Sequence, residues 1–201
     1  MLTVGNDAAS VERMLGDGGL ACPRCGGRLA RWGWARRRTV FGPGRRGTAV
    51  RPRRSRCRAC GATHVLLPAR LLLRRADEGP VIGAALAAAA RGRGHRPVAA
   101  ALGVPEGTVR GWLRRAAGNA GRLRELFTRA AAAVSGDPVP LEPAGSGLAD
   151  AVVAVAAAAA AAAARWPRLL AVSPWEVAAA VTNATLLSPA VAGRGFNASS
   201  L

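Results

Sequence analysis

The chain has 201 residues, enough for one large domain or for two or three small ones. Its formal net charge is +18, and every lysine-or-arginine position is arginine. This excess favours a polyanionic partner, either nucleic acid or an acidic membrane surface. Residues 1–19 lack the basic and apolar segments of a secretion signal, so we expect a flexible N-terminus and a cytoplasmic protein with reduced cysteines.

The positive charge is concentrated in one part of the chain. Residues 22–75 contain 16 arginines and no acid, and residues 91–129 contain nine arginines and two acids. From residue 137 onward the chain has three arginines and four acids. The segment 22–129 therefore carries the field that would attract a polyanion.

Two C-x-x-C pairs, each followed by glycine, predict a metal site. Four thiolates are the tetrahedral set that structural Zn²⁺ prefers, and Gly26 and Gly61 permit the left-handed turn of each knuckle. Two disulfides or four free thiols are the alternative. With four ligands present, we interpret His64 as a strand residue and expect no open catalytic position. The expected ligands of one structural Zn²⁺ are Cys22, Cys25, Cys57 and Cys60.

The 31 residues between the pairs resemble a β-hairpin with a long tip, and a third short strand follows Cys60. We therefore expect a zinc ribbon over residues 20–68. Trp32 and Trp34 share one face of its predicted first strand. They could stack on bases, but we favour packing against the neighbouring domain. Basic ribbon residues expected to contact a DNA backbone are Arg36, Arg37, Arg38, Arg45, Arg46, Arg53 and Arg54.

The segment from His95 to Ala116 predicts a helix-turn-helix. Ala99 is small where two helices would meet, Gly103 tolerates a left-handed turn, and Pro105 suits the start of the second helix. An ordinary helical hairpin is the alternative. The inner faces have apolar residues at Val98, Leu102, Val104, Val109 and Trp112.

The second helix of this unit has a buried stripe at Val109, Trp112, Leu113 and Ala116. The opposite face combines glycines with arginines, which suits close approach to the floor of a major groove. The residues expected to contact DNA are Arg96, Gly107, Thr108, Arg110, Gly111, Arg114 and Arg115.

The rest of the chain is expected to be helical. A leading helix over 78–91 and an amphipathic helix over 119–134 complete a DNA-binding domain at 69–135. A proline-rich linker at 136–148 precedes an alanine-rich helical region at 149–190 and a disordered tail at 191–201. The apolar run between Asp150 and Arg165 is too short and too weakly apolar to span a bilayer on this interpretation, so we expect no membrane contact. Its helices could pair two chains in a homodimer.

A family resemblance rests on six segments in order: CPRCGG, CRACGATHVLLPA, LLLRRAD, VIGAAL, GHRPVAAALG and TVRGWLRR. Residues 22–130 resemble an uncharacterised family of helix-turn-helix proteins from high-GC bacteria, in which a zinc ribbon precedes the DNA-binding helices. The arrangement is also similar to the N-terminal region of insertion-sequence transposases. The resemblance implies Zn²⁺ at the four cysteines and DNA contacts from residues 107–115, but it implies no reaction.

The fold we expect is mostly α, with a small N-terminal β ribbon, a helix-turn-helix bundle and alanine-rich C-terminal helices. The function we expect is binding of double-stranded DNA by a nucleoid-associated, non-enzymatic protein with no catalytic residue and no small-molecule substrate. It would be a transcriptional regulator, or an accessory or truncated product of a mobile element. An RNA binder or a non-specific nucleic-acid binder is the alternative. An active transposase or nuclease is disfavoured because the 11 acids do not cluster on strands.

Overall fold

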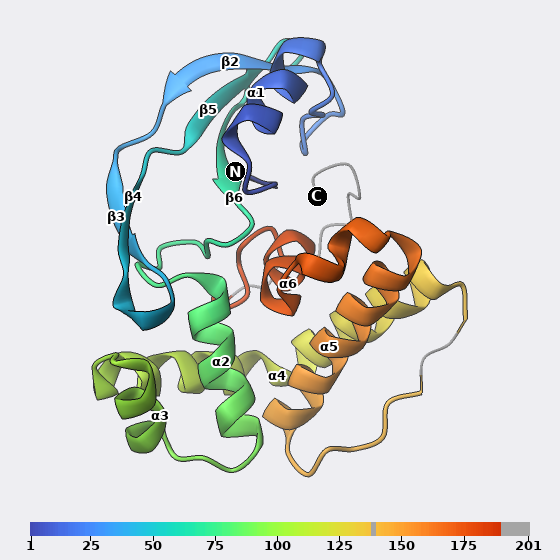
Figure 1. Cartoon of the computed structure of the whole chain (residues 1–201). Helices are drawn as coiled ribbons and strands as arrows, with labels where there is room; N and C mark the ends of the chain where they lie inside the picture. Colours follow the sequence, from blue (N-terminus) through green and yellow to red (C-terminus); the bar gives the residue numbers. More distant parts are fainter. Residues whose placement is uncertain (138–139, 190–201) are drawn as a thin grey trace.

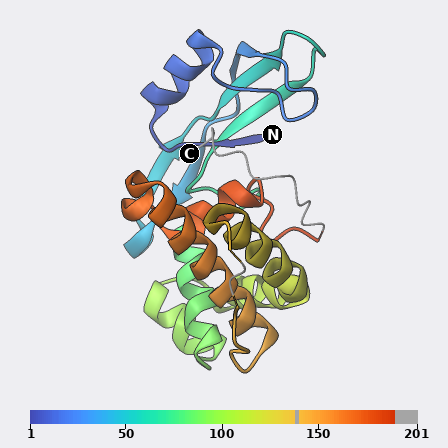
Figure 2. The same cartoon turned by 90° about the vertical axis from the view of Figure 1, so that its right-hand side faces the viewer.

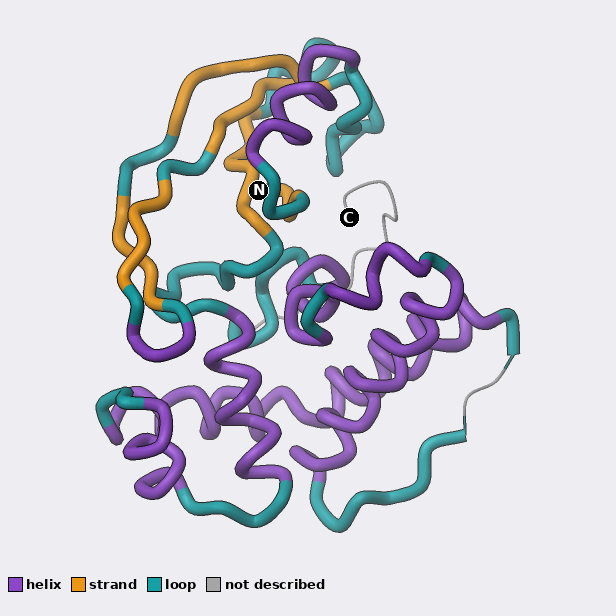
Figure 3. The backbone as a smooth tube through the Cα atoms, in the orientation of Figure 1, coloured by secondary structure: helices purple, strands orange, loops and turns teal. Residues whose placement is uncertain are grey.

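The structure is a computed structural model that describes residues 1–137 and 140–189. A curved ribbon of strands lies beside a larger body of helices (Figure 1 and Figure 3), and the 90° view in Figure 2 shows the same division. The described chain is mostly helical with a small N-terminal sheet region, as the composition and motifs predicted. The disordered tail expected at 191–201 lies outside the described residues.

The hairpin between the cysteine pairs forms as two successive ladders. Strand β2 (Leu29–Trp34) pairs antiparallel with β5 (Arg53–Cys57), and β3 (Arg38–Phe41) pairs antiparallel with β4 (Gly47–Val50). The backbone bond from Ala35 N to Pro52 O, 2.8 Å long, connects the ladders. The tip is the short helix η1 (Pro43–Arg45). The third strand after the second knuckle, β6 (Thr63–Pro68), pairs antiparallel with β5.

The N-terminal segment is ordered, where we expected flexibility. Strand β1 (Leu2–Val4) pairs parallel with β6, and helix α1 (Ala8–Asp17) follows it. Asp7 caps α1 by accepting the N–H groups of Ala9 and Ser10. The physical reason for the order is burial, since the ribbon alone has little apolar material. The cluster that β1 and α1 complete includes Leu2, Val4, Val11, Leu15, Leu29 and Leu66.

Five α-helices and one short 3₁₀-helix build the described helical body. They are α2 (Gly79–Ala90), α3 (His95–Leu102), α4 (Glu106–Ser135), α5 (Gly147–Arg165), η2 (Pro167–Ala171) and α6 (Pro174–Val181). The expected second helix and the amphipathic helix after it form one continuous helix of 30 residues, α4. Its stripe of Val109, Trp112, Ala116 and Phe127 is buried in a single apolar cluster with residues of α2, α5 and α6. The C-terminal helices are therefore part of the same core.

Helix α5 lies against α4 along much of its length (Figure 1). Its buried residues include Ala151, Ala154, Ala158 and Ala162, whose small side chains allow close approach. α5 has 19 residues, longer than the run between Asp150 and Arg165, and an 18-residue window of mean hydropathy 1.9, so it is long and apolar enough to cross a membrane by length and composition alone. One such helix is not a clear membrane span. A helix buried in a protein core meets the same criterion, and the packed alanine face of α5 is of that kind.

Hydrogen bonds join the ribbon to the helical body. The backbone N–H of Thr3 donates to Asn183 Oδ1 at 2.9 Å, and Asn6 Nδ2 donates to Glu176 Oε1 at 2.8 Å. Leu71 and Ala184 share a small buried cluster with the hairpin residue Val40. These contacts set the orientation of the ribbon relative to the helices.

Candidate functional site

The four cysteine sulfurs meet at one end of the ribbon. All four Sγ atoms lie within 4.8 Å of one another. The pairs Cys22–Cys60 and Cys25–Cys57 have sulfur separations of 3.8 Å and 3.5 Å. Zn–S bonds of about 2.3 Å place tetrahedral sulfurs about 3.8 Å apart, so this arrangement fits a metal ion such as zinc.

The knuckles place the sulfurs through their own backbone bonds. Gly26 N donates to Cys22 O at 2.8 Å, and Gly61 N donates to Cys57 O at 3.1 Å. Both glycines have the left-handed φ that their position after C-x-x-C predicted, 74° and 71°. Gly27 has a different role, since a Cβ there would lie 2.8 Å from Ala59 Cβ and 3.1 Å from Cys57 Sγ. The close approach of the two knuckles requires that glycine.

The protonation of the thiols also suits a cation. The backbone N–H of Cys60 points at Cys57 Sγ and, with that of Ala59, lowers the pKa of Cys57 to about 6. The N–H of Gly27 acts in the same direction on Cys25, but contacts with the Cys60 and Cys57 sulfurs raise the pKa of Cys25 to about 11. One thiolate therefore forms readily, and further thiolates beside it need a positive charge. A divalent metal ion supplies that charge.

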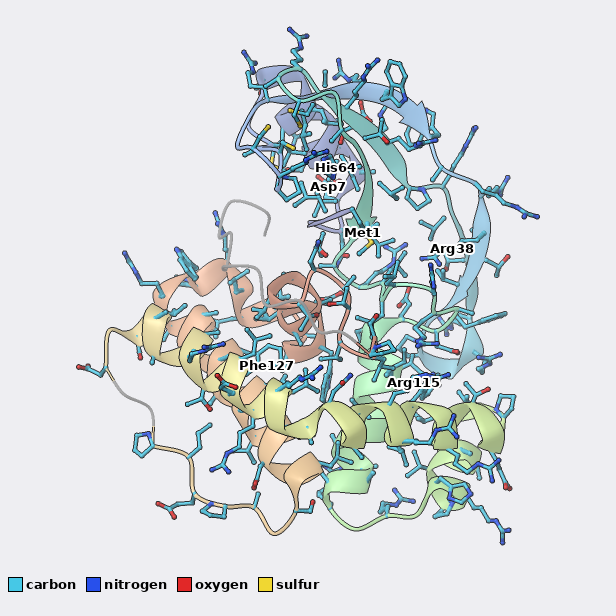
Figure 4. The ribbon with its side chains drawn as sticks, turned by 180° about the vertical axis from the view of Figure 1, so that it is seen from behind. Met1, Asp7, Arg38, His64, Arg115 and Phe127 are labelled. Carbon is cyan, nitrogen blue, oxygen red and sulfur yellow. The ribbon has the colours of Figure 1, made fainter. Side chains whose placement is uncertain are left out.

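His64 is a strand residue, as expected, but it also contacts the cysteine cluster. It is buried in β6, and its Nε2 lies 3.4 Å from Cys22 Sγ. Figure 4 shows His64 beside the sulfur atoms of the ribbon. A ring nitrogen at this distance can orient a sulfur ligand from outside the ligand set. The closeness of His64 to the second knuckle was visible in the sequence, but its contact with Cys22 depends on the register of β6.

A β-bulge separates the two ribbon tryptophans. The register of β2 against β5 shifts between Arg31 and Gly33, so one extra residue lies opposite Arg54. Trp34 then lies under Arg53, at 4.5 Å from guanidinium carbon to ring centroid, while Trp32 lies under Arg56 at 4.7 Å.

Arg53 and Arg56 are three residues apart on one strand and point to opposite faces, so the two tryptophans do so as well. Their predicted common face was wrong. Both rings are exposed, Trp32 by 51% and Trp34 by 46%, so packing against a neighbouring domain does not describe them either.

The ribbon arginines divide into paired and exposed groups. Arg45 is bonded to the buried carboxylate of Asp77, and Arg53 Nε lies 2.7 Å from Glu12 Oε1 with only 14% of its side chain exposed. Burial lowers the pKa of Arg38, which donates to Arg75 O. Arg54 is half-buried. These four arginines are poorly placed for the expected contacts with a DNA backbone. The arginines of that set that remain exposed are Arg36, Arg37 and Arg46.

Sequence reasoning did not identify Glu12 as a partner of the ribbon. Its carboxylate in α1 accepts from Arg31 Nε at 2.9 Å and pairs with Arg53. The interaction depends on the folding of α1 over the strands, which we had expected to be absent. One acid therefore offsets part of the arginine charge on that face.

The turn between α3 and α4 has the local geometry that the sequence predicted. Gly103 is left-handed with φ 63°, Ala99 is buried, and the cluster beneath includes Val98, Val104, Val109 and Trp112. On the opposite side of α4, Gly107, Arg110, Arg114 and Arg115 are exposed, whereas Thr108 and Gly111 are half-buried.

Two of the arginines expected to contact DNA, Arg96 and Arg115, have contacts within the protein. Arg96 of α3 is exposed and lies 3.6 Å from Glu106. Arg115, which is labelled in Figure 4, donates to Gly111 O at 3.0 Å. Burial lowers the pKa of Arg75, and the positive charge of Arg115 lowers it further. This side of α4 is therefore near the segment that joins the ribbon to α2.

Comparison with known proteins gives one similarity. No curated protein and no solved structure matches the chain. A family model described as a domain of unknown function, DUF6431, matches residues 22–112. This span starts at the first cysteine and ends in α4, so it includes the complete cysteine cluster, α2, α3 and the turn at Gly103. The chain is therefore similar to that family across its arginine-rich half.

Proposed function

We propose that this protein binds double-stranded DNA in a sequence-specific manner, with α3 and α4 as a helix-turn-helix and a structural Zn²⁺ in the ribbon. The observation that carries the proposal is the exposed face of the first turns of α4. Arg110 and Arg114 lie there, opposite the buried stripe, in a helix whose other side is fully packed. Such a helix can enter a major groove without disturbing the core beneath it.

The glycines of this face support a close approach. A Cβ at Gly107 would have no neighbouring atom within 4 Å, so nothing inside the protein requires a glycine there. Gly107 is the second residue of α4, and without a Cβ it leaves the backbone of the first turn open to a ligand. Close approach of this helix face to base edges would account for the glycine at position 107.

The ribbon tip adds positive charge beside the same turn. A Cβ at Gly103 would lie 3.3 Å from Arg45 Cγ, so η1 lies next to the α3–α4 turn. The neighbouring Arg46 is exposed and could bind a phosphate while α4 occupies the groove. Arg45 itself is bonded to Asp77 and serves to fix the tip.

A binding role without catalysis is the form that we propose. Three of the acids that follow the turn have structural partners: Asp150 pairs with Arg124 at 3.4 Å, Glu125 with Arg129 at 3.2 Å, and Glu176 closes the capping box of α6. A transcriptional regulator, or an accessory or truncated product of a mobile element similar to the N-terminal region of transposases, fits this arrangement.

The test begins with selection of a preferred duplex from a random library, followed by titrations on the selected and on a random duplex. Arg110→Ala and Arg114→Ala should each weaken binding of the selected duplex by about 1–3 kcal/mol and of the random duplex by much less. Arg129→Ala is the matched control, since Arg129 is also exposed and on α4 but lies far from the turn.

Equal losses from all three changes on both duplexes would refute sequence reading by α4. Stronger binding of a structured RNA of equal length would favour the RNA alternative instead. The zinc part of the proposal is checked separately, by elemental analysis of protein purified without chelator, where one zinc per chain is expected.

A further inference from the structure

The outer face of the ribbon has an open pocket next to the second cysteine knuckle. Its volume is about 510 Å³, and its wall includes Trp32, Arg56, Arg58 and Gly61. None of the described residues that line it is acidic. Arg31 at its edge is paired with Glu12, so the pocket combines an aromatic ring with the positive charge of Arg56 and Arg58.

Trp32 is held in place and remains accessible. The guanidinium of Arg56 lies over its ring at 4.7 Å, and Arg56 Nε donates to Gly61 O at 3.3 Å, which fixes that guanidinium to the knuckle. Even so, 51% of the Trp32 surface is exposed. A ring fixed on one side and open on another needs little ordering when a planar ligand binds.

We propose that this pocket binds single-stranded nucleic acid, with an unpaired base stacked on Trp32 and the adjoining phosphates at Arg56 and Arg58. Stacking platforms flanked by basic side chains are how proteins hold unpaired strands, because every base has a π face and every nucleotide a phosphate. The site is separate from α4 and does not depend on duplex binding there.

The inner face of the same ribbon lacks this combination. Trp34 lines a smaller pocket of about 230 Å³ together with Glu12, and the arginine over its ring, Arg53, is paired with that carboxylate. A phosphate there would meet the carboxylate of Glu12. Trp34 is thus an internal control that differs from Trp32 by two residues in sequence and by the face it occupies.

The experiment measures fluorescence anisotropy of labelled ten-nucleotide (dU) and (rU) strands, which differ only in the 2′-hydroxyl, with the full-length, zinc-loaded protein. Trp32→Ala should weaken binding of single strands about 5- to 150-fold, which is the effect of losing one base stack. Trp34→Ala should leave single-strand affinity within about twofold of the wild type. Arg56→Gln should reduce affinity and flatten its salt dependence by about 0.7 units of slope, the value for one phosphate of a single strand.

Zinc content and far-UV circular dichroism are measured for each variant to check that it folds. Trp32→Phe is included as a variant that keeps an aromatic ring at this position. Phe at this position should restore most of the affinity. Comparison of the two strands tells whether the 2′-hydroxyl contributes.

The proposal is overturned if the wild type does not bind single strands, or if Trp32→Ala and Trp34→Ala are equally impaired. It is also overturned if Trp32→Ala loses duplex and single-strand affinity to the same degree. Failure here would leave the Arg110 and Arg114 test of duplex binding unaffected.

Discussion

The ribbon and the helical body are ordered by different interactions. The helical body buries a continuous apolar cluster that runs from Leu72 to Leu187. The ribbon has a small cluster, two members of which are the cysteines Cys22 and Cys57, and it uses arginine–acid pairs to hold α1 over its strands. One region therefore depends on apolar burial, and the other on a small cluster, on charge pairing and on a four-cysteine site that could hold a metal ion. The following changes should affect one region and spare the other.

Removal of the metal should have the largest effect and should be confined to the ribbon. Binding of a structural Zn²⁺ contributes on the order of 10 kcal/mol to folding of such modules, so chelation or Cys57→Ser should disorder the strands. The core of the helical body contains none of the cysteines, and its helical circular dichroism should persist. Chelator titration followed at far- and near-ultraviolet wavelengths checks this, with zinc re-addition as the control. Loss of helix and ribbon together would contradict the division.

The converse change is Phe127→Ala in the helical body. Phe127 is fully buried in α4, and its truncation should reduce the free energy of unfolding by about 3–5 kcal/mol. Zinc content should stay at the wild-type value because the cavity lies outside the ribbon. Denaturant unfolding with metal analysis measures both quantities. Val153→Ala, on an exposed position of α5, is the control and should change stability little.

Arginine substitutions should distinguish structural from ligand-facing charge within the ribbon. Arg53→Ala removes the pairing with Glu12 and a bond to Gly33 O, and should cost about 1.5–3 kcal/mol of stability. It should leave the salt dependence of DNA binding unchanged. Arg37→Ala, at an exposed position, should do the opposite and flatten the salt slope by about one unit if Arg37 contacts a phosphate. An equal salt effect of the two changes would show that Arg53 leaves its partner on binding.

The smallest effects concern two helical glycines. A Cβ at Gly83 would lie 2.0 Å from Trp175 Cγ, so Gly83→Ala should push α2 and α6 apart at a cost of about 1–3 kcal/mol. Gly118 has no atom within 4 Å of its Cβ position, and Gly118→Ala should stabilise α4 by about 0.5–1 kcal/mol. Thermal unfolding of both variants measures the difference. Stabilisation by both would mean that the α2–α6 contact is looser than described.

Local signals in the sequence predicted the local structure well. The glycine after each C-x-x-C, the left-handed Gly103 and the stripe of Val109 and Trp112 each depend on a few neighbouring residues, and the structure has them as expected. The N-terminal order also had local signals that went unused, namely a capping Asp7 and a left-handed Gly18 at the ends of α1.

Features that depend on distant partners could not be predicted in the same way. The parallel pairing of β1 with β6 joins residues more than 60 positions apart, and the bulge in β2 depends on register against β5. A run of alanines has no periodicity, so the face of α5 that contacts α4 was not visible in the sequence. The division of the arginines into paired and exposed groups likewise required the positions of Glu12 and Asp77.

The bonds between Thr3 and Asn183 have a consequence for the order in which the protein can mature during translation. Asn183 is added 180 residues after Thr3. At roughly 5–20 residues per second, that is a delay of about 9–36 s. The cysteines and both ribbon ladders leave the ribosome well before then, so a metal ion could bind the four thiols while the helices are still being made. The ribbon tip can meet Asp77 and α3 earlier, but the first strand gains its bonds to Ala179 and Asn183 only when α6 and the residues after it emerge.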